Sequence, residues 1–233
     1  MASVAEHLVH QLEGAGVRHI YGIVGDSLNP VVDAVRRSKK IRWIHVRHEE
    51  TAAFAAAAEA EITGQLAVCA GSCGPGNLHL INGLYDANRS HLPVLAIASH
   101  IPTSQIGTGF FQETHPDRIF DECSVFSEMI SSSEQVPRVT RSAIQQALSN
   151  HGVAVLTLPG DIADMEVSGN LPDTITSPRP ARVVPNMEDV QGLADAINRA
   201  GKVTLFVGAG ARGAHDPIME LAELAKAPAV SYT

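Results

Sequence analysis

The chain has 233 residues, enough to bury a sizeable core in one large or two modest domains. With 45% hydrophobic and 18% charged residues, its composition is that of a folded globular protein and excludes a disordered one. The net charge of −8 disfavours nucleic acid and anionic membrane surfaces, so we expect no nucleic-acid partner.

Targeting signals are not evident in the sequence. No apolar run approaches the roughly 20 residues that a membrane helix needs. The N-terminus, MASVAEHLVHQLEGAG, carries acids and histidines where a signal peptide has a basic start and an apolar core. We therefore expect a cytoplasmic protein.

Three cysteines, Cys69, Cys73 and Cys123, are an odd number in a chain long enough to fold without disulfides. Cys69, Cys73 and the nearby His79 raise the question of zinc. However, Cys69 lies in the apolar run LAVCAG, where a cysteine is usually a small buried residue. Because no second ligand pair follows at zinc-finger spacing, we predict no metal site.

Strands alternate with helices in the first part of the chain. The predicted strands are residues 19–24, 41–46, 66–70, 93–99 and 153–158. Helices are predicted over residues 27–38, 49–62 and 133–150, and a further helix begins near Pro75. Asp26 or Ser27 is expected to cap the first of these helices. In the helix over residues 133–150, Val139, Ile144 and Leu148 lie near one face. Continuous apolar strands indicate a parallel sheet that is covered on both faces. The predicted fold class is therefore α/β with a doubly wound parallel sheet.

A second α/β pattern follows a proline-rich segment. We expect a first domain over residues 1–165, a linker over 166–185 and the beginning of a second domain over 186–233. Three of the expected linker's prolines are Pro172, Pro178 and Pro180.

The expected second domain opens on a helix over residues 187–200, capped by Asn186. A strand over residues 203–207, the turn GAGARGAH and a helix capped by Asp216 follow. The last segment, APAVSYT, has the character of a further strand. Because one helix-flanked strand pair cannot close a core, we expect these residues to be the front part of a longer polypeptide.

Three polar or glycine-rich segments follow the first three predicted strands. They are VGDS (24–27), RHEE (47–50) and GSCGPGN (71–77). Ligands of open parallel sheets bind beyond the carboxyl ends of the strands, so the three segments predict one site at this edge. The glycines of GSCGPGN give a backbone that can lie flat against a planar or charged ligand, although a tight turn without a ligand also fits.

A fourth segment, GAGARG (208–213), matches the pattern G-x-G-x-x-G. The expected helix cap at Asp216 falls beyond the glycines, whereas the dinucleotide fingerprint opens its helix within them. Nucleotide binding, with Arg212 as a charge partner, and a plain tight turn both remain open. The histidines show no HExxH pattern, and GPGN has no serine at an elbow position, so a hydrolase is not supported.

The stretch VRHEETAAFAAAAEAEITGQLAVCAGSCGPGNLHLINGLYDANRSHLPVLAIASHIP resembles the pyrimidine-binding domain of thiamine-diphosphate enzymes. Within that family it is most similar to pyruvate dehydrogenase (quinone) and the related pyruvate oxidases. The later stretches GTGFFQETHPDRIFDECS and FVGAGARGAH fit the same subgroup.

The resemblance gives Glu49 a catalytic role. The family's glutamate at this position hydrogen-bonds a ring nitrogen of the cofactor's aminopyrimidine and favours its imino tautomer. A helix N-terminus favours the charged carboxylate by roughly 0.3–1 kcal/mol, which is less than the cost of removing a carboxylate from water. If Glu49 is buried, loss of solvation should therefore dominate and leave a proton-sharing acid, whereas Glu50 points about 100° away around the helix and makes a structural or interface contact.

The resemblance also implies other site residues. Gly25, Asp26 and Ser27 would lie beside the reacting part of the cofactor, and Gly74, Pro75, Gly76 and Asn77 would lie against it. Phe111 and Gln112 would line the substrate cavity. Gly208, Gly210, Ala211 and Arg212 would contact FAD.

The implied function is oxidative decarboxylation of pyruvate to acetate and CO2, with thiamine diphosphate and FAD as cofactors and a quinone as electron acceptor. The alternatives are acetolactate synthase or a non-oxidative 2-keto acid decarboxylase of the same cofactor class. The family's G-D-G…N-N motif, which holds Mg²⁺ and the diphosphate, does not occur in this sequence. We therefore expect the Mg²⁺ ligands to lie elsewhere and this chain to be inactive alone. A homo-oligomer, as a dimer of dimers, is implied, with membrane contact only through segments outside these residues.

Overall fold

The computed structural model describes residues 2–167 and 183–231. The chain divides into two compact units, Met1–Ala181 and Arg182–Thr233, and each is described by itself. The prolines Pro172, Pro178 and Pro180 of the predicted linker lie outside the described residues.

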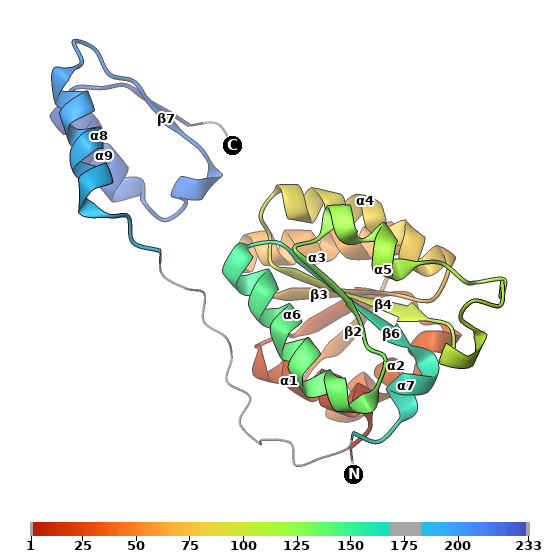
Figure 1. Ribbon diagram of the computed structural model, residues 1–233. Helices are drawn as coiled ribbons and strands as arrows, with labels where there is room; N and C mark the ends of the chain where they lie inside the picture. Colours follow the sequence, from red (N-terminus) through yellow and green to blue (C-terminus); the bar gives the residue numbers. More distant parts are fainter. Residues whose placement is uncertain (1, 168–182, 232–233) are drawn as a thin grey trace. The chain divides into compact units, whose positions relative to one another are not determined.

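The first unit is built on a six-stranded parallel sheet with the order β2-β1-β3-β4-β6-β5 (Figure 1). The strands are β1 (His19–Gly22), β2 (Arg42–His45), β3 (Ala67–Gly71), β4 (Val94–His100), β5 (Phe126–Met129) and β6 (Val153–Pro159). The chain runs outward from β1 to β2 and then crosses to β3 on the other side. This is the doubly wound α/β fold that the apolar runs predict, and the prediction of fold class is confirmed.

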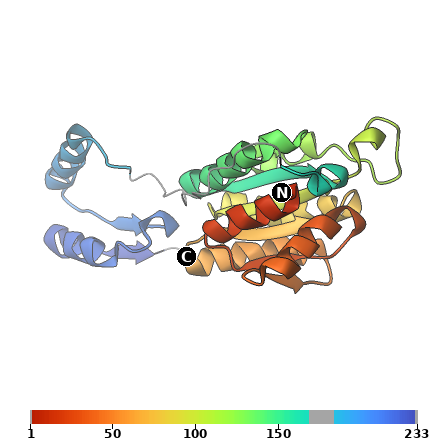
Figure 2. The ribbon, with the colours of Figure 1, turned by 90° about the horizontal axis from the view of Figure 1, so that it is seen from below.

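Helices cover both faces of this sheet. They are α1 (Val4–Gly14), α2 (Asn29–Ser38), α3 (Glu49–Thr63), α4 (Pro75–Arg89), α5 (Pro116–Ile119), α6 (Val136–Asn150) and α7 (Gly160–Asp164). On one face α1 contacts α2, α6 and α7, and Figure 2 shows α1 and α6 side by side. On the other face α3 and α4 pack against each other.

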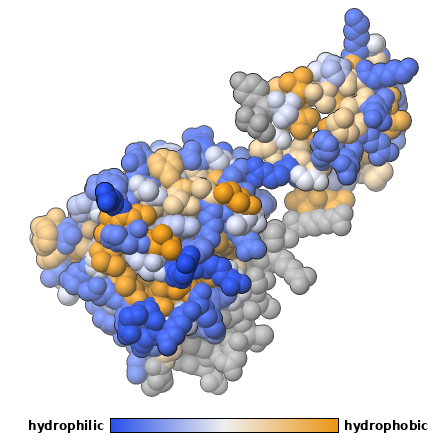
Figure 3. Space-filling view, turned by 180° about the vertical axis from the view of Figure 1, so that it is seen from behind, coloured by the Kyte–Doolittle hydropathy of each residue, from blue (hydrophilic) through white to orange (hydrophobic). Residues whose placement is uncertain are grey.

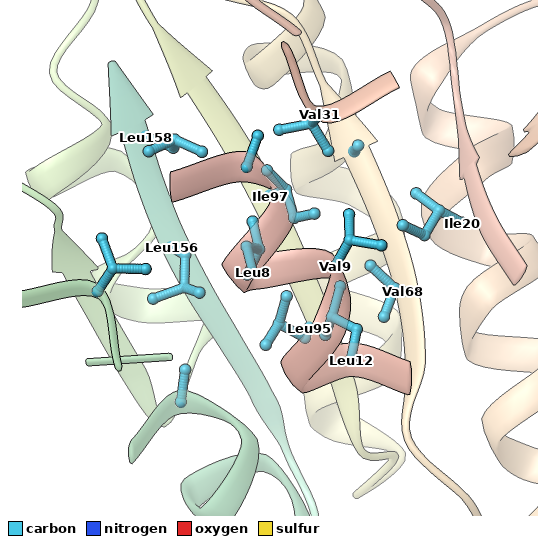
Figure 4. Packing of buried hydrophobic residues seen from close by; sticks show 14 of the residues in the cluster. Leu8, Val9, Leu12, Ile20, Val31, Val68, Leu95, Ile97, Leu156 and Leu158 are labelled. Carbon is cyan, nitrogen blue, oxygen red and sulfur yellow. The ribbon is translucent and has the colours of Figure 1, made fainter. Parts of the chain in front are cut away.

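The central strands β3, β4 and β6 are mostly apolar because both faces of the sheet are buried there. In β3, Val68 and Ala70 belong to the core under α1, whereas Ala67 and Cys69 belong to the core under α3 and α4. Figure 4 shows the first core, where α1 packs on the strands. Its labelled side chains are Leu8, Val9, Leu12, Ile20, Val31, Val68, Leu95, Ile97, Leu156 and Leu158.

The second core depends on small residues. Five buried alanines of α3 face the sheet and α4: Ala52, Ala53, Ala56, Ala57 and Ala60. On α4, a Cβ built on Gly83 would lie 2.5 Å from the Cβ of Ala53, so the two helices approach as closely as their smallest side chains allow.

Among the differences from expectation in the first unit are the starts of two helices. Helix α2 begins at Asn29, after a 3-10 turn over Asp26–Leu28, and Leu28 occupies its N-cap position. The prediction that Asp26 or Ser27 caps this helix is therefore wrong. Helix α1 was not predicted, although Ser3 and Glu6 form a capping box that marks its start.

The second unit contains α8 (Met187–Arg199), β7 (Leu205–Val207), α9 (His215–Ala225) and β8 (Ala229–Ser231), and its two strands pair in parallel. Asn186 caps α8 as predicted, because its side chain accepts a hydrogen bond from Asp189 N at 2.8 Å. The predicted cap at Asp216 is wrong, since α9 begins at His215 and Ala214 occupies the N-cap position.

Candidate active site

The strand order explains why three loops meet at one edge of the sheet. Strand β1 lies between β2 and β3, with Gly22 opposite both His45 and Ala70 at the carboxyl ends. The segments that follow these strands therefore leave the sheet as neighbours. Ser27 Oγ lies 3.0 Å from Ser72 Oγ and accepts a hydrogen bond from Cys73 N at 3.0 Å, which ties the first loop to the third.

Glu49 is the first residue of α3 and lies at this edge. Its exposed fraction is 9%, so the condition of burial for a proton-sharing acid is met. Its Oε2 lies 3.1 Å from Nδ1 of His79, which is one turn into α4. An imidazole N–H that donates to this oxygen fixes the direction of the carboxylate and leaves Oε1 to face the glycine-rich turn.

Glu50 has a different environment. Its carboxylate is partly exposed, and its Oε1 accepts a hydrogen bond from Nδ2 of Asn82 at 2.7 Å. This bond links α3 to α4, so the expectation that Glu50 makes a structural contact is confirmed. The two adjacent acids therefore differ in burial and in partner.

Glycines let the segments at this edge of the sheet approach one another closely. A Cβ built on Gly76 would lie 3.3 Å from Glu49 Oε1, and one built on Gly25 would lie 2.3 Å from Ser72 Oγ. Gly74 has φ +68° and would place a Cβ 3.1 Å from Gln112. Gly74 and Gly76 are themselves buried, so these glycines let the loops pack tightly around the Glu49 carboxylate.

Asn77 is fully buried at the start of α4. Its Nδ2 donates a hydrogen bond to the carbonyl of Ser99 at 2.5 Å, and its Oδ1 has no hydrogen-bond partner among the described residues. The side-chain amide therefore fastens α4 to the end of β4.

A cavity of about 660 Å³ opens at the same edge of the sheet. Asp26, Ser27, Cys73, Phe110 and Gln112 are among its lining residues. Phe111 is 83% exposed, and its ring lies 4.7 Å from that of Phe110. Of the two residues predicted to line a substrate cavity, the structure brings Gln112 to this cavity and leaves Phe111 largely in solvent.

One further group of side chains at the site has the chemistry to hold a metal ion. His48, Glu49 and His79 each offer a donor atom within 4.8 Å of the others, and the two imidazole rings stack at 4.3 Å. Two histidines and a glutamate are a common ligand set for zinc. His79 therefore lies with His48 and Glu49, whereas the sequence had associated it with Cys69 and Cys73.

The three thiols are buried and free. Burial raises the pKa of Cys69 to about 12 and that of Cys123 to about 11, which keeps both protonated and unreactive near neutral pH. Cys69 therefore acts as a small core residue, in agreement with the expectation from its apolar surroundings.

In the second unit, Gly208, Gly210, Ala211 and Arg212 lie at the turn between β7 and α9. Gly208 precedes a 3-10 turn over Ala209–Ala211. A Cβ built on Gly208 or Gly210 would meet no heavy atom within 4 Å among the described residues. The backbone of this turn is accessible to a ligand, and α9 starts two residues beyond Gly213, as the spacing indicated.

Comparison with known proteins identifies the class. Residues 2–119 match the family described as "Thiamine pyrophosphate enzyme, N-terminal TPP binding domain". The match covers the β1, β2 and β3 loops, Glu49 and the glycine-rich turn. The chain belongs to this family of thiamine-pyrophosphate enzymes, and its six-stranded sheet is the pyrimidine-binding fold.

Individual relatives are similar over nearly the whole chain. An uncharacterised 42.6 kDa protein from the isoamylase 3′ region of Pseudomonas amyloderamosa is 57% identical over 97% of this chain and 58% of its own length. Pyruvate oxidase from Lactiplantibacillus plantarum is 35% identical over 96% of this chain and 38% of its own length. Acetolactate synthase from Mycobacterium bovis is also 35% identical, over 97% of this chain and 37% of its own length.

These relatives are longer proteins, so the chain spans between about two fifths and three fifths of their lengths. Membership of the family makes thiamine diphosphate the expected cofactor. Among the described residues, no helix is long and apolar enough to cross a membrane.

Proposed function

We propose that this chain forms the pyrimidine-binding part of an enzyme that decarboxylates pyruvate oxidatively, with thiamine diphosphate and FAD as cofactors and a quinone as electron acceptor. The observation that carries the first half of the proposal is the buried Glu49 carboxylate, which lies against the backbone of Gly76 in the glycine-rich turn. In an enzyme of this family such a carboxylate holds the proton that the aminopyrimidine ring needs.

The residues of this chain would act as follows. Glu49 would share a proton with a ring nitrogen through Oε1, while His79 holds Oε2. Gly74, Pro75 and Gly76 would support one side of the ring, and Gly25, Asp26 and Ser27 would lie near the reacting end. When bound, thiamine diphosphate supplies a nucleophilic carbon and an electron sink for decarboxylation.

The second half of the proposal, oxidation, depends on the second unit. The accessible turn with Gly208, Gly210, Ala211 and Arg212 is the proposed FAD contact. Mg²⁺ would be held by residues outside this chain. The equal identity to a pyruvate oxidase and an acetolactate synthase leaves acetolactate synthesis, or non-oxidative decarboxylation, as the second candidate.

We further propose that the protein is a homo-oligomer, as a dimer of dimers. Apolar side chains on α3 and α4 remain exposed in the isolated chain: Phe54 and Leu78 are each 43% exposed and Ile62 is 85% exposed. A space-filling view shows apolar residues gathered on one face of the first unit, with polar residues around them (Figure 3). A second subunit on such a surface would remove it from water.

The test compares Glu49→Gln with Glu50→Gln in the polypeptide that the gene encodes. Glutamine keeps the shape of Glu49 but cannot share its proton, so turnover of pyruvate should fall by roughly 10²–10⁴, the range of general acid–base contributions. Glu50→Gln should cost less than about tenfold. Equal effects of the two substitutions would contradict the role of Glu49.

The reaction itself is assigned by the flavin. An oxidoreductase should bleach its flavin absorbance when pyruvate is added without oxygen and recover it when a quinone is added. Formation of acetolactate with no change in the flavin spectrum would establish the alternative function.

A further inference from the structure

A loop over residues 103–112 forms one wall of the cavity at the active-site edge. It follows β4 and Pro102, starts with a 3-10 turn over Thr103–Gln105, and ends before α5. Gln105, Phe110 and Gln112 of this loop line the cavity. Two carboxylates from outside these ten residues fasten it at separate points.

The first carboxylate belongs to Asp161 in α7. Thr103 N lies 3.0 Å and 3.1 Å from its two oxygens, and Thr103 Oγ1 donates a hydrogen bond to Oδ2 at 2.5 Å. Asp161 therefore fixes the point where the loop leaves β4.

The second carboxylate belongs to Glu113, at the far end of the loop. Gly107 N donates to its Oε1, and Gly109 N donates to its Oε2 at 2.8 Å. Gly107 and Gly109 have φ +85° and +76°, a conformation that favours glycine and lets nearby amides converge on an anion. The backbone N–H of Gly107 is the main cause that lowers the pKa of Glu113 below its usual value.

The position of this loop matters because its end touches the glycine-rich turn. Gln112 approaches so closely that a Cβ built on Gly74 would lie 3.1 Å from its Cβ and its carbonyl oxygen. Ser27 and Cys73 line the same cavity from the β1 and β3 loops. A shift of the loop would therefore change the shape of the cavity without altering Glu49.

We propose that Glu113 is a positioning residue: by holding Gly107 and Gly109 it sets where Phe110 and Gln112 stand in the wall of the substrate cavity. Asp161 assists by fixing Thr103. Glu113 acts through the backbone of the loop. The role of Glu113 in holding the loop does not depend on the proposed function. Only the identity of the ligand in this cavity, a small 2-keto acid, rests on it.

The substitution Glu113→Gln tests this role. It keeps the length of the side chain but replaces one acceptor oxygen with an NH2 group, which cannot accept from a backbone N–H. We expect the amides of Gly107 and Gly109 to exchange with solvent at least about tenfold faster, whereas amides in α3 and α4 are unchanged. The matched control is Glu128→Gln, since Glu128 is an exposed carboxylate on β5. This substitution should change neither the exchange of the Gly107 and Gly109 amides nor that of the amides in α3 and α4.

Kinetics separate positioning from a general loss of structure. In Glu113→Gln the KM for pyruvate should rise by about tenfold or more while kcat changes less than about threefold and the affinity for thiamine diphosphate stays the same. A KM equal to that of the unaltered protein, or exchange that is not faster, overturns the proposal. If the unaltered protein fails to bind thiamine diphosphate, the proposed function is wrong, and the exchange measurement alone still decides whether Glu113 holds the loop.

Discussion

The close approach of α3 and α4 can be tested by adding one methyl group at Gly83. A Cβ at this position would lie 2.5 Å from Ala53 Cβ and 2.8 Å from Phe54 N. Because Phe54 N belongs to the backbone of α3, the contact cannot be relieved by rotating a side chain. Gly83→Ala should therefore push the two helices apart.

The magnitude follows from two opposing effects. Overpacking of a tight core typically costs about 1–3 kcal/mol, whereas replacing glycine by alanine inside a helix gains about 1 kcal/mol. The clash is severe enough that we expect a net loss of about 1–2 kcal/mol in the free energy of unfolding. For a domain of this size that loss corresponds to a fall of roughly 2–8 °C in Tm.

The assay is thermal and urea unfolding followed by circular dichroism, with Ala58→Ser as the control. Ala58 is exposed on α3, so its substitution should stay within about 0.5 kcal/mol of the unaltered protein. Since Glu49 and His79 sit on the two helices that separate, Gly83→Ala should also weaken thiamine diphosphate binding. A Tm that is unchanged or higher would refute the close packing of α3 and α4.

Three other predictions concern buried or fastened groups. Asn77→Ala removes the donor to the Ser99 carbonyl and should lower the free energy of unfolding by about 1–3 kcal/mol, measured with urea, whereas Asn82→Ala at the surface should cost less. Burial raises the pKa of the Cys69 thiol to about 12, so at pH 8 this thiol should resist a thiol reagent in the native protein and react once the chain is unfolded. Mass spectrometry locates the labelled cysteine, and rapid labelling of Cys69 in the native protein would contradict this. Because the pKa of Glu113 is lowered, its contribution to loop order should be present above its unfolded value of about 4.3 and disappear as pH falls through the lower folded value. The protection of the Gly107 amide, measured against its intrinsic exchange rate at each pH, should therefore fall only in acid.

Much of the architecture could be predicted because it follows from periodicity. Continuous apolar runs such as residues 153–158 are characteristic of strands buried on both faces, and they appear as β4 and β6 with every residue buried. The short edge strand β5 was missed because its residues are only partly buried and Glu128 interrupts the apolar pattern. Helix α1 has a local signal in the capping box of Ser3 and Glu6, but the segment lacks the strong apolar pattern that marks the strands.

Capping was predicted well only where a single side chain decides it. Asn186 caps α8 through its own oxygen, a local interaction that the sequence reveals. At the start of α2 the hydroxyl of Ser27 instead bonds to Ser72 and Cys73, 45 and 46 residues away. Long-range hydrogen bonds of this kind compete with local caps, and no local pattern announces them.

The same distinction applies to the site. The loops after β1, β2 and β3 were expected to converge because a parallel sheet brings its carboxyl ends to one edge. The partner of Glu49 could not be found in this way. His79 lies 30 positions further on, and its contact depends on how closely α3 and α4 pack.

That dependence links the alanines of α3 to the chemistry of Glu49. Larger residues at Ala53 or Gly83 would hold the helices further apart, and the 3.1 Å contact between Glu49 Oε2 and His79 Nδ1 would be lost. Both carboxylate oxygens of Glu49 would then be free to rotate, without the fixed direction that His79 gives them. The run of small side chains thus stabilises the fold on one side of the helix and, at its N-terminus, orients the carboxylate. Glu50, which bonds Asn82 across the same pair of helices, helps to keep that spacing and so supports the position of Glu49.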